Sequence, residues 1–324
     1  MWRLILRPAM CIASISKPYI GRFAPSPTGA LHFGSLVAAV ASYCDAKANK
    51  GKWLVRMEDL DRPREAPGAA DAILRQLEAF GFEWDDEVTY QSKRDELYAA
   101  AFNHLQNQAL IYPCTCTRKE IADSSTAQSI DGLIYPKTCQ PKFYQKQNLP
   151  QTSTHAAYRA VVLDKNITFL DAIQGTITQN LARDVGDFIV KRADGLFAYQ
   201  LAVVVDDAAQ GVSHIVRGAD LLDSTPRQIY LQQQLNFSKP HYVHVPIAVN
   251  YEGEKLSKQC RAEPLNISLA APQLVEALRF LGQQPPPAIK NAALADVWYW
   301  AIANWKQDCV SKQRKIMVNI YNCF

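Results

Sequence analysis

The sequence predicts an α/β fold built on a doubly wound parallel sheet. Apolar strand patterns and amphipathic helix patterns alternate from residue 19 to about residue 108, the order typical of parallel sheets. A strand-like run also enters a rigid loop at Gly21–Ser35, which opens an alanine-rich helical pattern. A cluster of acidic residues follows the next strand, at the end where open α/β sheets bind ligands.

Hydrophobic periodicity predicts the order of the first elements. After a strand beginning at Tyr19, apolar residues recur at helical spacing from Leu36 to Lys50, where an Asn-Lys-Gly sequence signals the helix end. A short apolar strand and two amphipathic helices follow, at Lys52–Met57, Gly68–Phe80 and Lys93 to about Gln108. Residues 18–113 are therefore expected to form the first half of the α/β domain.

At Cys114 the alternation breaks, and a polar stretch rich in Ser, Thr, Gln, Lys and Pro begins. We interpret residues 114–185 as an insertion, with strand candidates at Ala156–Leu163 and Gly175–Gln179. Residues 186–262 are expected to be the second half of the domain, with a strand at His214–Val216, a helix that the Thr225 hydroxyl caps, and a strand at Tyr242–Val249. Residues 263–324 are expected to form a short helical C-terminal region and tail.

Composition indicates a globular chain with room for about two domains, since 48% of its 324 residues are hydrophobic and 20% are charged. A net charge of 35 − 31 = +4 is compatible with a polyanionic partner but does not require one. Eight scattered cysteines favour a reducing, cytoplasmic location, and no apolar run is long enough to span a membrane. Residues 1–17 are expected to be a disordered extension, and Met10 could be the true start.

The loop Gly21–Ser35, which reads GRFAPSPTGALHFGS, has the features of an anion site. It leads into a helix N-terminus, where the first N–H groups lack partners and the helix dipole favours negative charge. Its prolines restrict the backbone, while Gly29 and Gly34 allow close approach to a ligand. The loop is neither a Walker A sequence nor a GxGxxG fingerprint. An ordinary strand–turn–helix corner would also look like this.

A second short motif, KLSKQ at Lys255–Gln259, places two lysines three residues apart in a glycine-preceded loop. Alone, such a pair is usually a solvated surface. Together with HFGS, it resembles the HIGH and KMSKS signatures of class I aminoacyl-tRNA synthetases. The sequences RFAPSPTG, RMEDLD, GLFAYQLAVVVDD and IVRGADLLDSTPRQ resemble the glutamyl/glutaminyl branch, over roughly residues 19–285. By length, the chain is similar to the glutamyl-Q tRNA(Asp) synthetases of this branch, which lack the anticodon-binding domain.

The resemblance implies a Rossmann-type catalytic domain that activates glutamate with ATP, with Mg²⁺ expected, to form glutamyl adenylate. His32, Gly34 and Ser35 would hold ATP at the helix N-terminus, with His32 also catalytic. Lys258, which matches the second lysine of KMSKS, would bind ATP and stabilise charge on the transferring phosphate; Lys255 is a weaker catalytic candidate. Three positions depart from the signatures, namely Ser35, Leu256 and Gln259, and the glutamate branch tolerates these changes.

Glutamate needs positive partners for its two carboxylates and a negative partner for its ammonium group. By resemblance, the arginines at ligand positions are Arg22 and Arg217, whose planar forks suit carboxylates; we expect Arg217 to read the side-chain carboxylate. Glu58 matches the residue that meets the ammonium group, and Tyr199 matches another contact. The remaining predicted pocket residues follow Arg22 directly: Phe23, Ala24, Pro25 and Ser26. Any of the charged residues could instead form a salt bridge at the sheet edge.

Cys114, Cys116 and Cys139 offer three thiolate ligands, and no histidine lies nearby to complete a tetrahedral zinc site. Free surface thiols would give the same spacing. The sequence resembles the C-x-C…Y-x-x-x-C pattern of glutamyl-Q synthetases, which implies Tyr135 as the fourth ligand, in a loop longer than usual. The zinc would be structural, because the insertion has too little core of its own.

Three functions remain open at this stage. The resemblance implies a monomeric enzyme whose partners are glutamate, ATP and tRNA(Asp) carrying queuosine. It would attach glutamate to the cyclopentene ring of that base. A short glutamyl-tRNA synthetase that charges the 3′ end of tRNA(Glu) is an alternative. So is a catalytically inactive RNA-binding relative, although intact His32, Lys258, Glu58, Arg22 and Arg217 argue against it.

Overall fold

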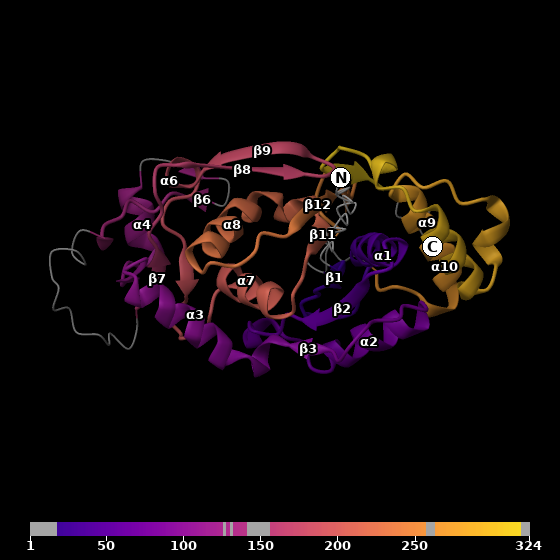
Figure 1. Ribbon diagram of the computed structural model, residues 1–324, viewed down its shortest axis with the longest axis horizontal. Coiled ribbons are helices and arrows are strands. Elements are labelled where there is room, and N and C mark those ends of the chain that lie inside the picture. The colour runs from indigo at the N-terminus through magenta and orange to yellow at the C-terminus, as the bar shows by residue number, and fades with distance from the viewer. Residues whose placement is uncertain (1–17, 126–127, 130–131, 141–155, 257–262, 319–324) are drawn as a thin grey trace, which may run out of the picture.

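The computed structural model describes residues 18–125, 128–129, 132–140, 156–256 and 263–318. The expectations for residues 1–17 and for Lys258 lie outside this part of the chain. The molecule is elongated, with the insertion at one end and the C-terminal helices at the other (Figure 1). None of the helices in the described ranges is long and apolar enough to cross a lipid bilayer.

Parallel strands form the centre of the molecule, as the sequence predicts. Strand β1 (Ile20–Phe23) pairs with β2 (Lys52–Met57), which pairs with β3 (Thr89–Tyr90). In the second half, β11 (His214–Gly218) pairs with β12 (His241–Val245). Strand β12 also pairs with β8 (Asn166–Asp171), which lies in the predicted insertion and forms an antiparallel hairpin with β9 (Gly175–Asn180). The Ser213 N–H donates to the Ile20 carbonyl at 2.9 Å, so the two halves of the domain meet where β11 lies beside β1.

Helices cover both faces of these strands, which is what doubly wound means. Neighbouring residues of one strand point to opposite faces, and Ile215 and Val216 accordingly belong to two different hydrophobic cores. One core includes residues of α1 (Phe33–Ala48), α2 (Ala69–Ala79), α9 (Ala270–Phe280) and α10 (Leu294–Asn304). The other includes residues of α3 (Asp95–Asn107), α7 (Tyr199–Ala209) and α8 (Thr225–Gln234).

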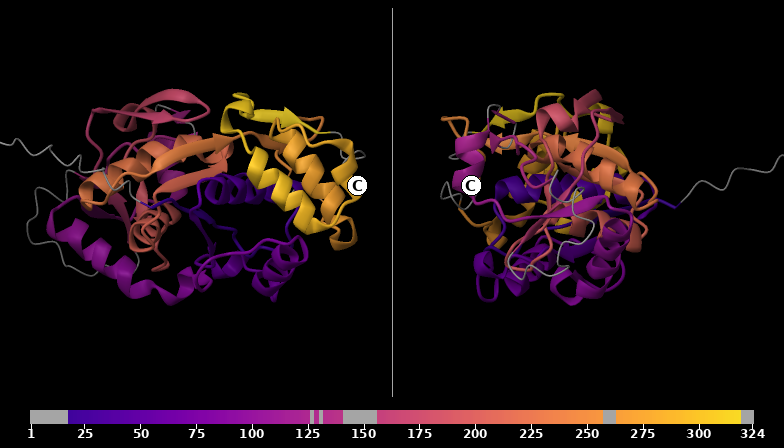
Figure 2. Two further views of the ribbon diagram at one scale, coloured as in Figure 1. Left: turned by 45° about the vertical axis from the view of Figure 1, so that its right-hand side comes forward. Right: turned by 90° about the vertical axis from the view of Figure 1, so that its left-hand side faces the viewer.

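At the insertion, a small antiparallel sheet has β7 (Ala157–Ala160) between two strands from the flanking segments, β4 (Ile111–Cys114) and β10 (Ile189–Lys191). Short elements complete the insertion: α4 (Arg118–Ser124), β5 (Gln128–Ser129), β6 (Gly132–Leu133) and α6 (Leu181–Asp184). Figure 2 shows this region at the opposite end of the molecule from α10. The predicted domain boundaries stay predictions.

The structure corrects three local expectations. The predicted strand Tyr242–Val249 is two strands, β12 and β13 (Ile247–Val249), because Pro246 has no N–H group for a ladder. Thr225 is not an N-cap but the first residue of α8, and its hydroxyl accepts a hydrogen bond from Arg217 at 2.9 Å. The C-terminal region is not only helical, since β14 (Lys315–Met317) pairs with β13.

Candidate active site

A cavity of about 1010 Å³ opens where β1, β2 and β11 end. This is the position at which open α/β sheets bind ligands. Its walls include every residue within the described ranges that the sequence assigned to ATP or glutamate: Arg22, Phe23, Ala24, Pro25, Ser26, His32, Gly34, Ser35, Glu58, Tyr199, Arg217 and Lys255. Segments far apart in the sequence thus meet in one hollow.

His32 caps the helix that begins at the cavity. Its backbone is extended, and its Nδ1 accepts a hydrogen bond from the Ser35 N–H at 3.3 Å. A neutral ring that accepts at Nδ1 carries its proton on Nε2. A Cβ on Gly34 would lie 3.2 Å from this ring and 3.4 Å from the Leu256 carbonyl. The absence of a side chain at residue 34 therefore keeps the imidazole and the second motif close to the helix start.

The described parts of the KLSKQ region lie against the same helix end. The Leu256 N–H donates to the Ala248 carbonyl at 2.9 Å, and beyond residue 262 Pro264 forms a β-bridge with His32. Lys255 donates to the Asp220 carboxylate at 2.5 Å. The first residues of the second motif, Lys255 and Leu256, therefore lie near the HFGS motif, although more than 200 residues separate the two motifs in the sequence.

Arg22 belongs to a buried network of charges beneath the cavity. Its Nε donates to Asp207 Oδ1 at 3.0 Å, and Arg56 Nη2 donates to the same oxygen at 2.8 Å. Although burial acts in the opposite direction, these two guanidinium groups hold the pKa of Asp207 below its ordinary value. The adjacent Asp206 accepts hydrogen bonds from Arg94 at 2.6 Å and from other residues of the first half. Asp206 and Asp207 thus join α7 to the first half of the fold.

Glu58 follows β2 and borders the cavity. Burial raises its pKa to about 7, against the opposing effect of the charges on Arg56 and Arg22. Its carboxylate lies 3.6 Å from Arg56 Nη2. A cationic group bound in the cavity would favour the ionised form of this carboxyl.

Arg217 approaches the cavity from β11, and its side chain is buried. Its Nε donates to His244 Nε2 at 3.0 Å, and its Nη2 donates to Gln228 at 2.7 Å and to Thr225 at 2.9 Å. Its Nη1 is buried and has no hydrogen-bond partner among the residues that the structure describes. A buried donor without a partner is costly, so this nitrogen suits a ligand carboxylate.

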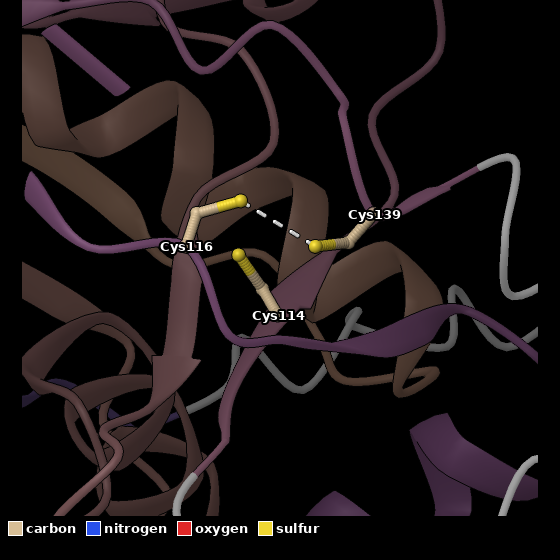
Figure 3. A group of neighbouring side chains, drawn as sticks. All are labelled: Cys114, Cys116 and Cys139. Carbon is tan, nitrogen blue, oxygen red and sulfur yellow. Dashed lines mark hydrogen bonds between the residues drawn. The ribbon is translucent and has the colours of Figure 1, made fainter. Parts of the chain in front are cut away.

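The cysteine cluster lies in the insertion, at the end of β4. The Sγ atoms of Cys114, Cys116 and Cys139 lie within 4.8 Å of one another and point toward one another (Figure 3). The Tyr135 hydroxyl lies 3.3 Å from Cys114 Sγ and 3.5 Å from Cys116 Sγ. A tetrahedral zinc with bonds of about 2.3 Å to sulfur separates its sulfurs by about 3.8 Å. The four side chains can therefore hold a metal ion, and they lie in a small hydrophobic cluster separate from both main cores.

Comparison with known proteins identifies the family. The model of the class I tRNA synthetases (E and Q), catalytic domain, matches residues 20–271. A glutamyl-Q tRNA(Asp) synthetase from Dechloromonas aromatica is 57% identical over 305 residues, which are 94% of this chain and 99% of the relative. One from Ectopseudomonas mendocina is 52% identical over 93% of this chain and 98% of the relative. The chain belongs to the glutamyl-Q tRNA(Asp) synthetase family.

A solved structure supports the fold of this glutamyl-Q synthetase family member. The crystal structure of a glutamate tRNA ligase from Elizabethkingia meningosepticum, in complex with its amino acid, superposes with a TM-score of 0.73. The alignment covers 95% of this chain and 68% of that one, at 22% sequence identity. The likeness confirms the predicted α/β catalytic domain with a parallel sheet.

Sequence reasoning missed several residues of the synthetase site. The sequence does not single out Arg56 and His244, and it offers Asp206 and Asp207 only as the last two letters of the motif GLFAYQLAVVVDD. All four are buried, and a buried charged residue needs a partner. That rule marks them as paired, but their partners lie too far along the chain to be named from sequence.

Proposed function

We propose that this protein activates glutamate with ATP, without tRNA, and transfers the glutamate to the queuosine base in the anticodon of tRNA(Asp). The observation that carries the proposal is that Arg22, Glu58 and Arg217 border the same cavity as His32 at the start of α1. Arg22, Glu58 and Arg217 carry charges opposite to those of glutamate, and the helix start at His32 suits the negative charge of a phosphate chain.

The glutamate end uses opposite charges. The Nη1 of Arg217, which has no partner among the described residues, would receive one carboxylate, and we expect this to be the side-chain carboxylate. Glu58 would receive the ammonium group, which would keep its carboxyl ionised despite burial. Arg22, held by Asp207, lies at the same wall and is the candidate for the other carboxylate. Phe23 to Ser26 and Tyr199 would shape the pocket between these charges.

The phosphate end uses the helix start. A carboxylate oxygen of glutamate attacks the α-phosphorus of ATP, so the new C–O–P bond forms as the bond to pyrophosphate breaks. Such a step needs positioning and charge neutralisation more than covalent help from the protein. His32, Gly34 and Ser35 would hold the phosphates at the N-terminus of α1. Lys258, with Lys255 as a lesser contributor, would neutralise developing charge, and an expected Mg²⁺ would supply further positive charge to the phosphates.

The test is glutamate-dependent exchange of pyrophosphate into ATP in the absence of tRNA, followed by assays with two acceptors. We expect exchange, and labelled glutamate on queuosine-containing tRNA(Asp) but not on the same tRNA lacking queuosine. Charging of tRNA(Glu) alone would establish the short glutamyl-tRNA synthetase instead. A folded protein that gives no exchange would be the inactive RNA-binding relative.

We also propose that Cys114, Cys116, Cys139 and Tyr135 hold a structural zinc. We expect about one zinc per chain in the purified protein and a loss of bound zinc in Cys139→Ser, because a tetrahedral site loses a thiolate. Metal analysis and amide hydrogen exchange measure this, and chelation should remove protection first in residues 114–139. The control is Cys309→Ser, an exposed cysteine outside the cluster, which should keep its zinc. If Cys139→Ser and Cys309→Ser contain equal amounts of zinc, the cysteine cluster is not the zinc site.

A further inference from the structure

A chain of three buried side chains links the strand β8 to the candidate glutamate site. Asp171, at the end of β8, lies with its Oδ2 2.6 Å from His244 Nδ1. On the other side of the imidazole, His244 Nε2 lies 3.0 Å from Arg217 Nε. The side chains of Asp171 and His244 have no solvent exposure. Three neighbouring strands, β8, β12 and β11, thus supply one residue each.

The donors and acceptors in this series of three side chains determine the tautomer and the charge of the His244 imidazole. An arginine Nε can only donate, so His244 Nε2 must be an acceptor, and the proton of a neutral ring then lies on Nδ1, facing Asp171. Burial lowers the pKa of His244 to about 4, and the charge of Arg217 acts in the same direction, whereas Asp171 opposes both. The ring is therefore neutral at pH 7. The Thr225 hydroxyl, 3.2 Å from Nε2, can donate to the same nitrogen.

Asp171 is itself fixed by the backbone. Its Oδ1 accepts hydrogen bonds from the N–H groups of Ile173 at 3.0 Å and Gln174 at 2.9 Å, in the turn between β8 and β9. Its Oδ2 therefore faces the imidazole in a set direction. Arg217 Nε donates its hydrogen bond to His244, and Arg217 Nη2 donates to Gln228 and Thr225. Nη1 alone is left for a ligand within the described part of the chain.

We propose that Asp171 and His244 are positioning residues for glutamate binding, because together they set the histidine tautomer that holds the Arg217 guanidinium in place. This inference rests on the proposed function. Arg217 would bind a carboxylate remote from the reacting one, so its displacement weakens binding of substrate and transition state alike. The KM for glutamate should therefore change far more than kcat.

Asp171→Asn tests the tautomer with almost no change in shape. The asparagine Oδ1 can keep the turn hydrogen bonds, but its amide N–H groups would face Nδ1 in place of the carboxylate. The imidazole then moves its proton to Nε2, where it opposes the Arg217 N–H. We expect the KM for glutamate in pyrophosphate exchange to rise about 10- to 100-fold, while the KM for ATP and the kcat change less than about threefold.

Two replacements of the histidine separate positioning from packing. His244→Asn retains a donor near Nδ1 but removes the acceptor for Arg217, whereas His244→Gln can place an amide oxygen near Nε2. We expect the asparagine variant to raise the KM for glutamate and the glutamine variant to recover part of the loss. The control is Val243→Ala, a buried position on the same strand whose side chain belongs to the opposite core; it should lower stability without raising this KM.

The outcomes are distinct. An unchanged KM for glutamate in Asp171→Asn, or an equal rise in Val243→Ala, overturns the positioning role. If His244→Asn does not fold, the Asp171→Asn result decides. If the unaltered protein shows no exchange, the proposed function fails, and calorimetric titration with L-glutamate then tests the inference by itself. In that case, equal affinities of the unaltered protein and Asp171→Asn overturn it.

Discussion

Asp207→Asn is expected to lower the free energy of unfolding by about 3–5 kcal/mol, because it removes the anion from between two buried guanidinium groups. Arg22 and Arg56 both donate to Asp207 Oδ1, at 3.0 and 2.8 Å. The Arg56 side chain has no solvent exposure, so water cannot replace the lost partner. An asparagine amide would in addition turn N–H groups toward the two cations or leave one of them with a single weak acceptor.

The loss of stability in Asp207→Asn should be fully present at neutral pH. The two arginines hold the pKa of Asp207 below its ordinary value, although burial alone would raise it. A carboxyl whose pKa is lower in the folded state contributes stability above its unfolded pKa of about 3.9 and loses it as the pH falls through the folded value. Urea unfolding of the two proteins at pH 7 and at pH 3 therefore measures the contribution, and the difference should shrink at the lower pH.

Asp86→Asn is the matched control, since it makes the same chemical change in an ion pair at the surface. Asp86 lies 2.9 Å from Lys52, and the two side chains are 59% and 53% exposed. Exposed pairs contribute about 0–1 kcal/mol, and asparagine tolerates the positive φ of 61° at this position. A loss of stability no larger in Asp207→Asn than in Asp86→Asn would contradict the role of the buried network.

The alternation of strands and helices was predictable because each element shows its own period in the sequence. The helix at residues 36–50 and the strand at 52–57 need only local spacing, and the structure has them as α1 and β2. The resemblance to the synthetase motifs sufficed to name Arg22, Glu58, Tyr199 and Arg217, which the structure brings to one cavity. Their assigned roles remain proposals.

The supporting residues were not predictable for a physical reason. The partners of Asp207 lie 185 and 151 residues before it, and Asp171 precedes its partner His244 by 73 residues. No periodicity records such a pairing, since it arises only when elements distant in the sequence come together in the fold. The break between β12 and β13, by contrast, was predictable from a single residue. Proline has no N–H group, so Pro246 interrupts the strand even though the residues around it are apolar.

Lys258→Ala is expected to reduce the kcat of pyrophosphate exchange by about 10²- to 10³-fold while leaving the unfolding transition unchanged. Loss of one charged donor that acts on the transition state costs about 3–4 kcal/mol. The described residues on either side of its loop, Leu256 and Pro264, lie beside Gly34 and His32. A lysine carried between these two anchor points is suited to reach phosphates held at the start of α1.

Lys255→Ala separates this role from a general need for positive charge. Lys255 already has a carboxylate partner, Asp220, at 2.5 Å, and its side chain is 48% exposed. Its removal should reduce kcat by less than about tenfold, with pyrophosphate exchange and KM for ATP measured under the same conditions for both variants. Equal reductions of kcat in the two variants would mean that the loop contributes only its overall positive charge and no specific contact. A loss confined to Lys258→Ala would place the transition-state contact on that residue, because each variant removes one positive charge from the same loop.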